Sequence, residues 1–182
     1  MFLTAVWRRR VDVAALTVAF GGAWLLWSLY SSAARVAWFY DRLEHVRNLN
    51  DAGALPDPDY DWRTLPWKTA SPRTFEPGAT ELTLVTNAEP YGYQAFASIE
   101  TKRARSVDLV FDAQLESGGA TIGFLQNGKW IASNSSQRPG RFTGANTAEL
   151  GRSRSLTVVI ANDNSAGESR LIVRSLRVYL RR

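Results

Sequence analysis

The sequence contains no cysteine and only one histidine, His45, in 182 residues. The absence of cysteine excludes disulfide bonds, thiolate zinc sites, iron–sulfur clusters and a cysteine nucleophile. A single histidine also excludes a metal site built from several imidazoles. A Ser–His–Asp triad cannot form within the C-terminal part of the chain, because His45 lies far upstream of it. We therefore expect neither a metal nor any other cofactor.

Groups of residues arranged for catalysis are equally scarce. The Gly118-Gly119 turn lacks the Lys–Ser/Thr pair of a phosphate-binding loop. Paired carboxylates remain as an alternative, but Asp108, Asp112 and Glu116 all occupy even positions along one run of alternating residues. They should therefore project from the polar face of a strand as a solvated row. The sequence predicts a protein that is not an enzyme.

Charged residues are absent from one long run, residues 13–34, which reads VAALTVAFGGAWLLWSLYSSAA. About 20 apolar residues suffice to cross a bilayer as a helix. We expect a single transmembrane helix here, with a cleaved signal peptide as the main alternative. Three arginines, Arg8, Arg9 and Arg10, favour a cytoplasmic location for residues 1–12. The C-terminal part would then lie in the periplasm, outside a bacterial inner (cytoplasmic) membrane.

One face of this predicted helix carries small residues at helical spacing, namely Ala15, Ala19, Gly22 and Ala23. Small residues let a second helix approach closely, so this face predicts packing against other integral membrane subunits. The alternative is that alanine and glycine are simply common in membrane helices.

The helical period continues through residues 35–50, where apolar residues recur every three or four positions. We expect a juxtamembrane amphipathic helix that lies on the bilayer surface or packs against a partner. His45 belongs to this segment. Ligation of a metal or tetrapyrrole by His45 is less favoured than a solvated side chain.

Residues 51–80 hold five of the seven prolines, at positions 56, 58, 66, 72 and 77. Proline prevents a regular helix, so we expect an extended strap between the membrane and the following domain. Aromatic residues prefer burial, and four of them occur in the strap: Tyr60, Trp62, Trp67 and Phe75. They predict contacts with a protein surface, either that of a partner or that of the chain itself.

From residue 81 the pattern changes to a period of two, in runs such as VDLVFDAQL and RLIVRSLRVYL. At least seven short strands are expected over residues 81–182, with a hairpin at Asn127-Gly128. This rhythm predicts an all-β sandwich of two sheets. The spacing leaves jelly-roll and immunoglobulin-like topologies open.

The run VDLVFDAQLESGGATIGFLQNGKWIAS, followed by SLTVVIAN and IVRSLRVYL, resembles jelly-roll domains of the galactose-binding and carbohydrate-binding-module type. The resemblance covers residues 81–182 and rests on strand rhythm. It implies a jelly-roll fold. Domains of this type bind sugars, proteins or nothing, so the resemblance bears on fold more than on function.

Binding of a sugar requires aromatic platforms and planar polar partners. Candidates are Tyr91, Tyr93, Trp130, Asn134, Asn162 and Asn164. Trp130 directly follows the predicted hairpin and could equally be the core tryptophan of the sandwich.

The region 81–182 is basic, with thirteen Lys and Arg against nine Asp and Glu. Nucleic acid is an unsuitable partner for a domain on the far side of a membrane. Anionic lipid headgroups or an acidic partner surface fit better. The alternative is a solvated edge strand that resists aggregation.

The leading hypothesis from sequence is a non-catalytic, single-pass accessory subunit that stabilises a multi-subunit bacterial inner-membrane complex. Photosynthetic reaction-centre–antenna complexes are one suitable host. The alternative hypothesis is a membrane-tethered carbohydrate-binding module of the cell envelope.

Overall fold

The computed structural model of the chain consists of two compact units, Met1–Arg42 and Leu43–Arg182. The structure describes residues 22, 24–31, 33–34, 37, 44, 56–151 and 154–182. In the first unit the described residues are helical. Among the residues that are described, no helix is long and apolar enough to cross a membrane.

Several sequence predictions fall wholly or partly outside the described residues. They are half of the predicted span 13–34, including Ala15, Ala19 and Ala23, nearly all of the amphipathic segment 35–50 with His45, and residues 51–55 of the strap. Gly22 is described, is helical and exposed, and has open space around the position of a Cβ atom. The predicted span and its packing face therefore stay predictions.

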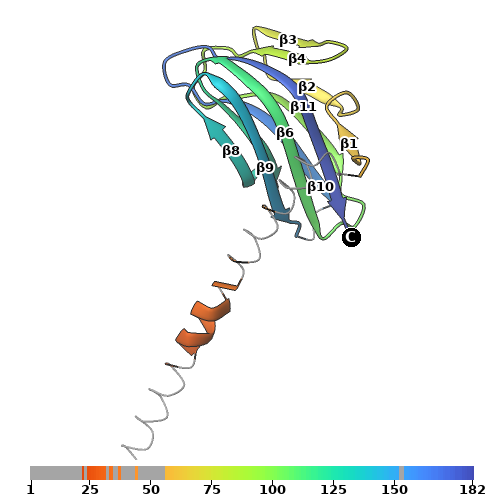
Figure 1. The fold of residues 1–182 in the computed structure, drawn as a ribbon, viewed down its shortest axis with the longest axis vertical. Coiled ribbons are helices and arrows are strands. Elements are labelled where there is room, and N and C mark those ends of the chain that lie inside the picture. The colour runs from red at the N-terminus through yellow and green to blue at the C-terminus, as the bar shows by residue number, and fades with distance from the viewer. Residues whose placement is uncertain are drawn as a thin grey trace, which may run out of the picture. The chain divides into compact units, whose positions relative to one another are not determined.

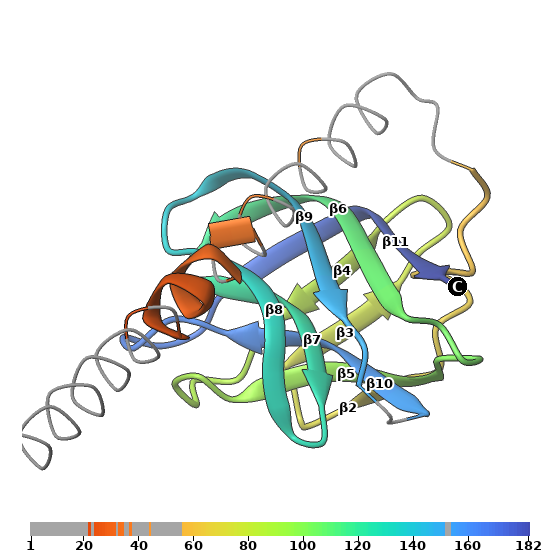
Figure 2. The same ribbon diagram turned by 90° about the horizontal axis from the view of Figure 1, so that it is seen from below.

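The second unit is a sandwich of two antiparallel sheets (Figures 1 and 2). Sheet A has the order β3-β4-β11-β6-β9, with β1 also paired to β11. Its strands are β1 (Tyr60–Asp61), β3 (Thr74–Pro77), β4 (Leu82–Val85), β6 (Ser106–Ser117), β9 (Gly140–Glu149) and β11 (Arg170–Arg181). Sheet B has the order β2-β5-β10-β7-β8. Its strands are β2 (Trp67–Thr69), β5 (Tyr93–Glu100), β7 (Ala120–Gln126), β8 (Lys129–Ser136) and β10 (Ser155–Asn162).

The pairing of the last eight strands is nested. β7 pairs with β8, β6 with β9, β5 with β10, and β4 with β11. Successive pairs alternate between the two sheets, as if one long hairpin had been wound around a barrel. This arrangement is a jelly roll. The predicted sandwich is confirmed, and the topology left open by the sequence is of the jelly-roll type. The innermost turn is the predicted Asn127-Gly128 hairpin, where both residues have positive φ, 52° and 75°.

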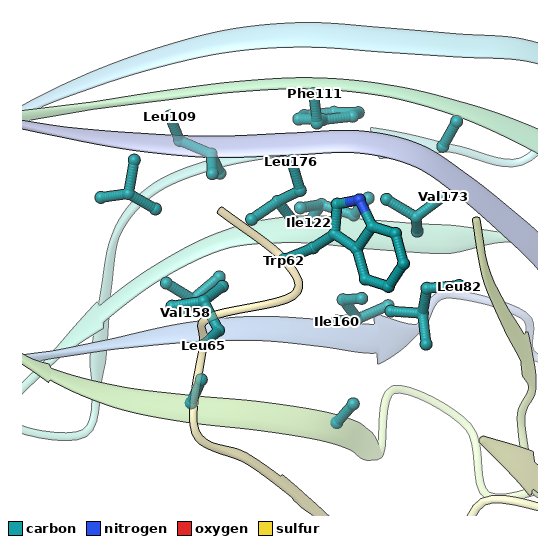
Figure 3. Close-up of a cluster of buried hydrophobic side chains, with 14 of the residues drawn as sticks. Trp62, Leu65, Leu82, Leu109, Phe111, Ile122, Val158, Ile160, Val173 and Leu176 are labelled. Carbon is teal, nitrogen blue, oxygen red and sulfur yellow. The ribbon is translucent and has the colours of Figure 1, made fainter. Parts of the chain in front are cut away.

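Alternation places one face of each strand in a common core. In β6, the odd-numbered residues from Val107 to Leu115 are buried in the main cluster. Figure 3 shows Leu109 and Phe111 above Ile122 of β7 and Val158 of β10. Apolar side chains from both sheets thus fill the space between the layers, which is the main source of stability for a sandwich.

The strap does not end where the sequence predicted, because residues 60–77 supply three strands to the sandwich. β1 pairs with β11, β2 with β5, and β3 with β4. The domain boundary at residue 81 is therefore wrong. The reason is that proline prevents a helix but is tolerated in short edge strands such as β3, which ends at Pro77.

Trp62 corrects the predicted role of the strap aromatics as partner contacts. Its side chain is 2% exposed and lies in the core with Leu82, Val173 and Leu176 (Figure 3). Trp67 is half-buried against the same core, and its indole N–H donates to the Trp62 carbonyl oxygen at 2.8 Å. These rings were expected to cover a surface, but they complete the chain's own core.

The other two strap aromatics also contact the sandwich itself. Phe75 packs edge-on against Trp67, with ring centroids 6.0 Å apart, and Tyr60 rests on the core from β1. Both are half-buried. These contacts partly bury both rings against the chain's own sandwich, so their burial does not require a second protein.

The carboxylate row on β6 differs from the prediction at its first member. Asp108 is fully buried rather than solvated. Its oxygens accept from the Thr147 hydroxyl at 2.7 Å and from Arg181 Nε at 2.9 Å. Asp112 and Glu116 remain partly exposed, in ion pairs with arginines. These partners on β9 and β11 offset the cost of burying the charged Asp108 carboxylate.

Candidate functional site on the outer face of sheet B

Three rows of residues across four strands form the central part of the face of sheet B that points away from the core; Glu100 of β5 and Ser155 of β10 continue this face beyond the third row. Each row runs from β5 through β10 and β7 to β8, following the strand register. The first row is Tyr93, Ala161, Thr121 and Ser135; the second is Phe96, Val159, Gly123 and Ser133; the third is Ser98, Thr157, Leu125 and Trp130. These residues are called the outer face of sheet B below.

None of the residues in the three rows carries a charge. Lys68 of β2 continues the second row at the edge of the sheet. The outer face of sheet A is different, because its strands present ion pairs such as Arg141–Asp112 and Arg181–Asp108. The two faces of the sandwich therefore suit different partners, and only that of sheet B suits an uncharged one.

Two aromatic rings meet on this face from opposite corners. The rings of Tyr93 and Trp130 contact edge-to-face, with centroids 5.8 Å apart and planes at 84°. Their strands, β5 and β8, are separated by β10 and β7. At about 4.8 Å between neighbouring strands, the two side chains must lie across the sheet to touch. Each ring is still about two-fifths exposed, at 40% and 39%.

Beneath the rings lies a small apolar floor. Leu125, Val159 and Ala161 form a buried cluster separate from the main core, with Phe96 packed against it. Leu125 is directly opposite Trp130, and Ala161 is directly opposite Tyr93. The strand register thus places the cluster beside both aromatic residues, and each ring keeps an exposed surface. In such an edge-to-face pair, a ligand can stack on the face of one ring and contact the other ring from the side.

Hydroxyl groups surround the aromatic pair. Ser98 and Thr157 lie side by side in the third row, with oxygens 3.4 Å apart. Thr121 and Ser135 lie together in the first row, with oxygens 2.6 Å apart. A hydroxyl both donates and accepts, so these pairs can bind a ligand's own hydroxyl groups.

Tyr91 lies just before β5 in an unusual backbone conformation. Its φ is +59°, and its side chain is 62% exposed. A left-handed conformation is costly for a bulky residue, and such strain concentrates at functional sites. Tyr91 stands two residues from Tyr93, so the strained loop presents a further ring beside the outer face of sheet B.

The loop that carries Tyr91 is held by a buried amide. Asn162, at the end of β10, is fully buried. Its Nδ2 donates to the carbonyl oxygens of Asn87 and Glu89, at 3.2 and 3.0 Å. Its backbone N–H also donates to the Gly92 carbonyl oxygen at 2.9 Å. The sequence named Asn162 as a glycan contact; its burial instead makes it a positioning residue for the loop.

Gln94 performs a similar task from the other side of the loop. It is fully buried, and its amide both donates to Asn87 Oδ1 and accepts from the Asn87 N–H, at 2.8 Å in each case. Sequence reasoning missed Gln94. Its position next to Tyr93 in an alternating strand was the only available signal.

Two further predicted contacts lie away from the aromatic pair. Asn134 pairs with Ile122, whose side chain is in the core, so it points inward and is half-buried. Asn164 is in the β10–β11 loop, where its Nδ2 donates to the Glu168 carbonyl oxygen. Of the six predicted residues, the structure brings Tyr93 and Trp130 into contact, and Tyr91 precedes Tyr93 by two residues. An asparagine is equally suited to fasten a loop and to bind a ligand, so sequence could not separate these roles.

The three rows of the outer face contain no carboxylate, imidazole or amine. Their polar groups are hydroxyls, and no neighbouring base activates them. Within the described part of the chain, no cluster of His, Asp or Glu could hold a metal ion. The arrangement can bind through ring faces and hydrogen bonds.

No protein-family model matches the sequence, and no curated protein is similar to it. Several solved structures share features of the fold. A CBM4 structure covers 61% of this chain and 77% of its own, at 8% identity and a TM-score of 0.47. A family 29 carbohydrate-binding module covers 69% and 80%, at 15% identity and 0.40. TmCBM61 in complex with β-1,4-galactotriose covers 63% and 88%, at 9% identity and 0.41. These structures are carbohydrate-binding modules, the kind of domain that the sequence resembles.

Proposed function

We propose that this protein is a non-catalytic binding module whose outer face of sheet B holds a neutral glycan. The observation that carries the proposal is the contact of Tyr93 with Trp130 across three rows of uncharged residues. A pyranose ring has an apolar C–H surface and a rim of hydroxyls. Aromatic faces match the first and serine and threonine hydroxyls match the second.

The three rows carry no charge, with Lys68 and Glu100 only at their margins, and this sets the class of glycan. A carboxylated or sulfated sugar would find no cation among the three rows to offset the cost of removing its charge from water. A neutral chain carries no such cost. We therefore assign neutral polysaccharides, lying across the strands along the line that joins the two rings, as the ligand class.

The described residues give no support to the hypothesis of an accessory subunit in a photosynthetic or other inner-membrane complex, and it stays a prediction. Three of its residues, Trp62, Trp67 and Phe75, are engaged in the sandwich. The predicted span adds to our proposal in one respect: it would tether the binding module to the bacterial inner membrane, with the sandwich in the periplasm.

The proposal is tested by affinity electrophoresis of the full chain, in mild detergent, through gels that contain neutral β-glucan, xylan or galactan. We expect at least one polysaccharide to retard the protein. Tyr93→Ala and Trp130→Ala should each weaken that retardation by about 2 kcal/mol, as expected for aromatic anchors.

Trp27→Ala is the matched control, because it removes an equally large and more exposed indole, 70% exposed, from the helical unit. It should leave retardation unchanged. Retardation by none of the neutral polysaccharides, or an equal loss in all three variants, would overturn the proposal.

A further inference from the structure

Charged side chains are divided unequally between the two ends of the sandwich. One end, called the basic end below, consists of the β5–β6, β7–β8 and β9–β10 connections and the last residues of β11 (Figure 1). Its exposed cations are Lys102, Arg103, Arg105, Lys129, Arg154 and Arg182. None of them forms an ion pair with another described residue. The exposed carboxylates there are Glu100, Glu149, Asp59 and the nearby Asp57, so cations are still in excess.

The opposite end, called the far end below, has the reverse balance. Its cations are Arg73, Arg138 and Arg170, and its carboxylates are Glu89, Glu116, Asp163 and Glu168. Two of the three cations are engaged in ion pairs: Arg73 with Glu168 at 2.9 Å and Arg170 with Glu116 at 2.6 Å. The sandwich is therefore polarised along its strands.

The segments of the basic end are joined by backbone hydrogen bonds. The Thr101 N–H donates to the Arg154 carbonyl oxygen at 2.9 Å, and the Arg105 N–H donates to that of Arg181 at 2.7 Å. The Leu150 N–H donates to the Arg105 carbonyl oxygen at 2.8 Å. Three segments that are distant in sequence thus present their cations as one surface of fixed backbone geometry.

The β5–β6 loop adopts a strained conformation at its two leading cations. Lys102 and Arg103 both have positive φ, 47° and 66°. The Ala104 N–H closes the turn by donating to the Thr101 carbonyl oxygen at 2.7 Å. Residues in left-handed conformations persist only where the surrounding structure holds them. This turn projects both side chains outward, and the Lys102 ammonium lies over the Tyr60 ring, 5.6 Å from its centroid.

The chain joins the sandwich at this same end. Tyr60 pairs with Val178 near the end of β11, and the Asp59 carboxylate accepts from the Leu180 N–H at 2.7 Å. The segment that precedes these residues in sequence contains the uncharged run 13–34, which is predicted to cross a bilayer. The end that is closest along the chain to the predicted span is thus the end with the excess of cations.

We propose that the basic end is a docking surface for the anionic headgroups of a phospholipid bilayer. Each lysine or arginine near such a surface is attracted by its negative potential. Because the cations are spread over several connections, they can contact several headgroups together. Docking in this way would hold the sandwich upright on the membrane and leave the outer face of sheet B, which runs along the strands, open at the side.

The test uses the absence of cysteine, which lets one introduced thiol carry a fluorescent label. In the full chain, Gly151→Cys labels the basic end and Ser165→Cys labels the far end; both positions are exposed. Each labelled protein is combined with vesicles of phosphatidylcholine, with or without phosphatidylglycerol. Quenching by neutral acrylamide then reports how accessible the label is to water.

We expect phosphatidylglycerol to reduce quenching of the label at residue 151 about twofold or more, and to leave that at residue 165 unchanged. High salt should reverse the effect, because at 1 M the screening length falls to about 3 Å. Equal quenching on both kinds of vesicle would overturn the proposal. So would protection of the far end. Neither outcome bears on glycan binding, which concerns a different surface.

Paired charge variants separate a local surface from net charge. Lys102→Gln combined with Arg103→Gln should restore the quenching seen without anionic lipid, because the two cations together contribute a factor of about 30 to docking. Arg73→Gln combined with Arg138→Gln removes the same charge from the far end and should have no effect. If both double variants lose protection equally, the attraction is due to net charge and the docking surface does not exist.

Discussion

Replacing Trp62 with alanine tests whether the proline-rich segment belongs to the core of the sandwich. The indole is 2% exposed and packs with residues of β4, β10 and β11. Truncation of a buried tryptophan or phenylalanine to alanine costs about 3–5 kcal/mol. We expect a loss in that range. It is a large share of the roughly 5–15 kcal/mol that stabilises a typical domain.

Trp62→Phe makes the prediction sharper. The indole Nε1 is buried and has no hydrogen-bond partner. Phenylalanine would keep most of the apolar contact and remove this unpaired donor. The loss should therefore be about 1 kcal/mol or less, since an unsatisfied buried group is itself costly.

The assay is urea unfolding of the full chain in mild detergent, followed by near-ultraviolet circular dichroism. Tyr91→Ala is the control, because that ring is 62% exposed and its removal should change stability by no more than about 0.5 kcal/mol. If Trp62→Ala costs less than about 1 kcal/mol, as surface substitutions do, the strap does not complete the core and the reasoning is refuted.

Three further predictions concern other parts of the sandwich. Asn162→Ala should cost about 3 kcal/mol in urea unfolding and should also weaken glycan retardation, because the Asn87 and Glu89 carbonyl oxygens of the Tyr91 loop and the Ser169 hydroxyl lose their partner. Gly144→Val should cost about 1–3 kcal/mol in the same assay, because even a Cβ atom would approach the Phe111 ring to 2.6 Å. Glycan affinity should change less than about twofold between low and high salt in affinity electrophoresis, since screening acts on charges and the three rows around the aromatic pair have none.

Strands with strict alternation could be predicted from the sequence. The run over β6 has large apolar residues at every second position, and its bounds differ from the expected ones by only a few residues. β9 was missed because its inward positions are Phe142, Gly144, Asn146 and Ala148, of which one is a large apolar residue. Small residues are required there, where Phe111 of β6 fills the space.

The strap shows a second limit of sequence reasoning. Proline and aromatic residues in residues 60–77 indicated an extended chain that seeks burial, and both statements hold in the structure. The partner could not be deduced, because β1, β2 and β3 pair with strands distant in sequence. Burial against the same chain and burial against another protein have the same signature in composition.

Only part of the candidate site could be predicted from the sequence. Tyr93 and Trp130 were named as platforms, but they lie on strands separated by two others. Their contact depends on the nested pairing of the jelly roll, which a pattern of period two does not encode. The serine and threonine hydroxyls around them were missed because such residues are common on any exposed strand.

The central claim is that a neutral glycan binds on the outer face of sheet B. It is tested most directly by a label at Ser133, in the second row of that face, introduced as Ser133→Cys in the cysteine-free chain. Thr143→Cys on the outer face of sheet A serves as the comparison. Titration with an oligosaccharide of whichever neutral polysaccharide retards the protein should produce a saturable fluorescence change at residue 133 and none at residue 143. No change at residue 133, or an equal change at both positions, would contradict the account.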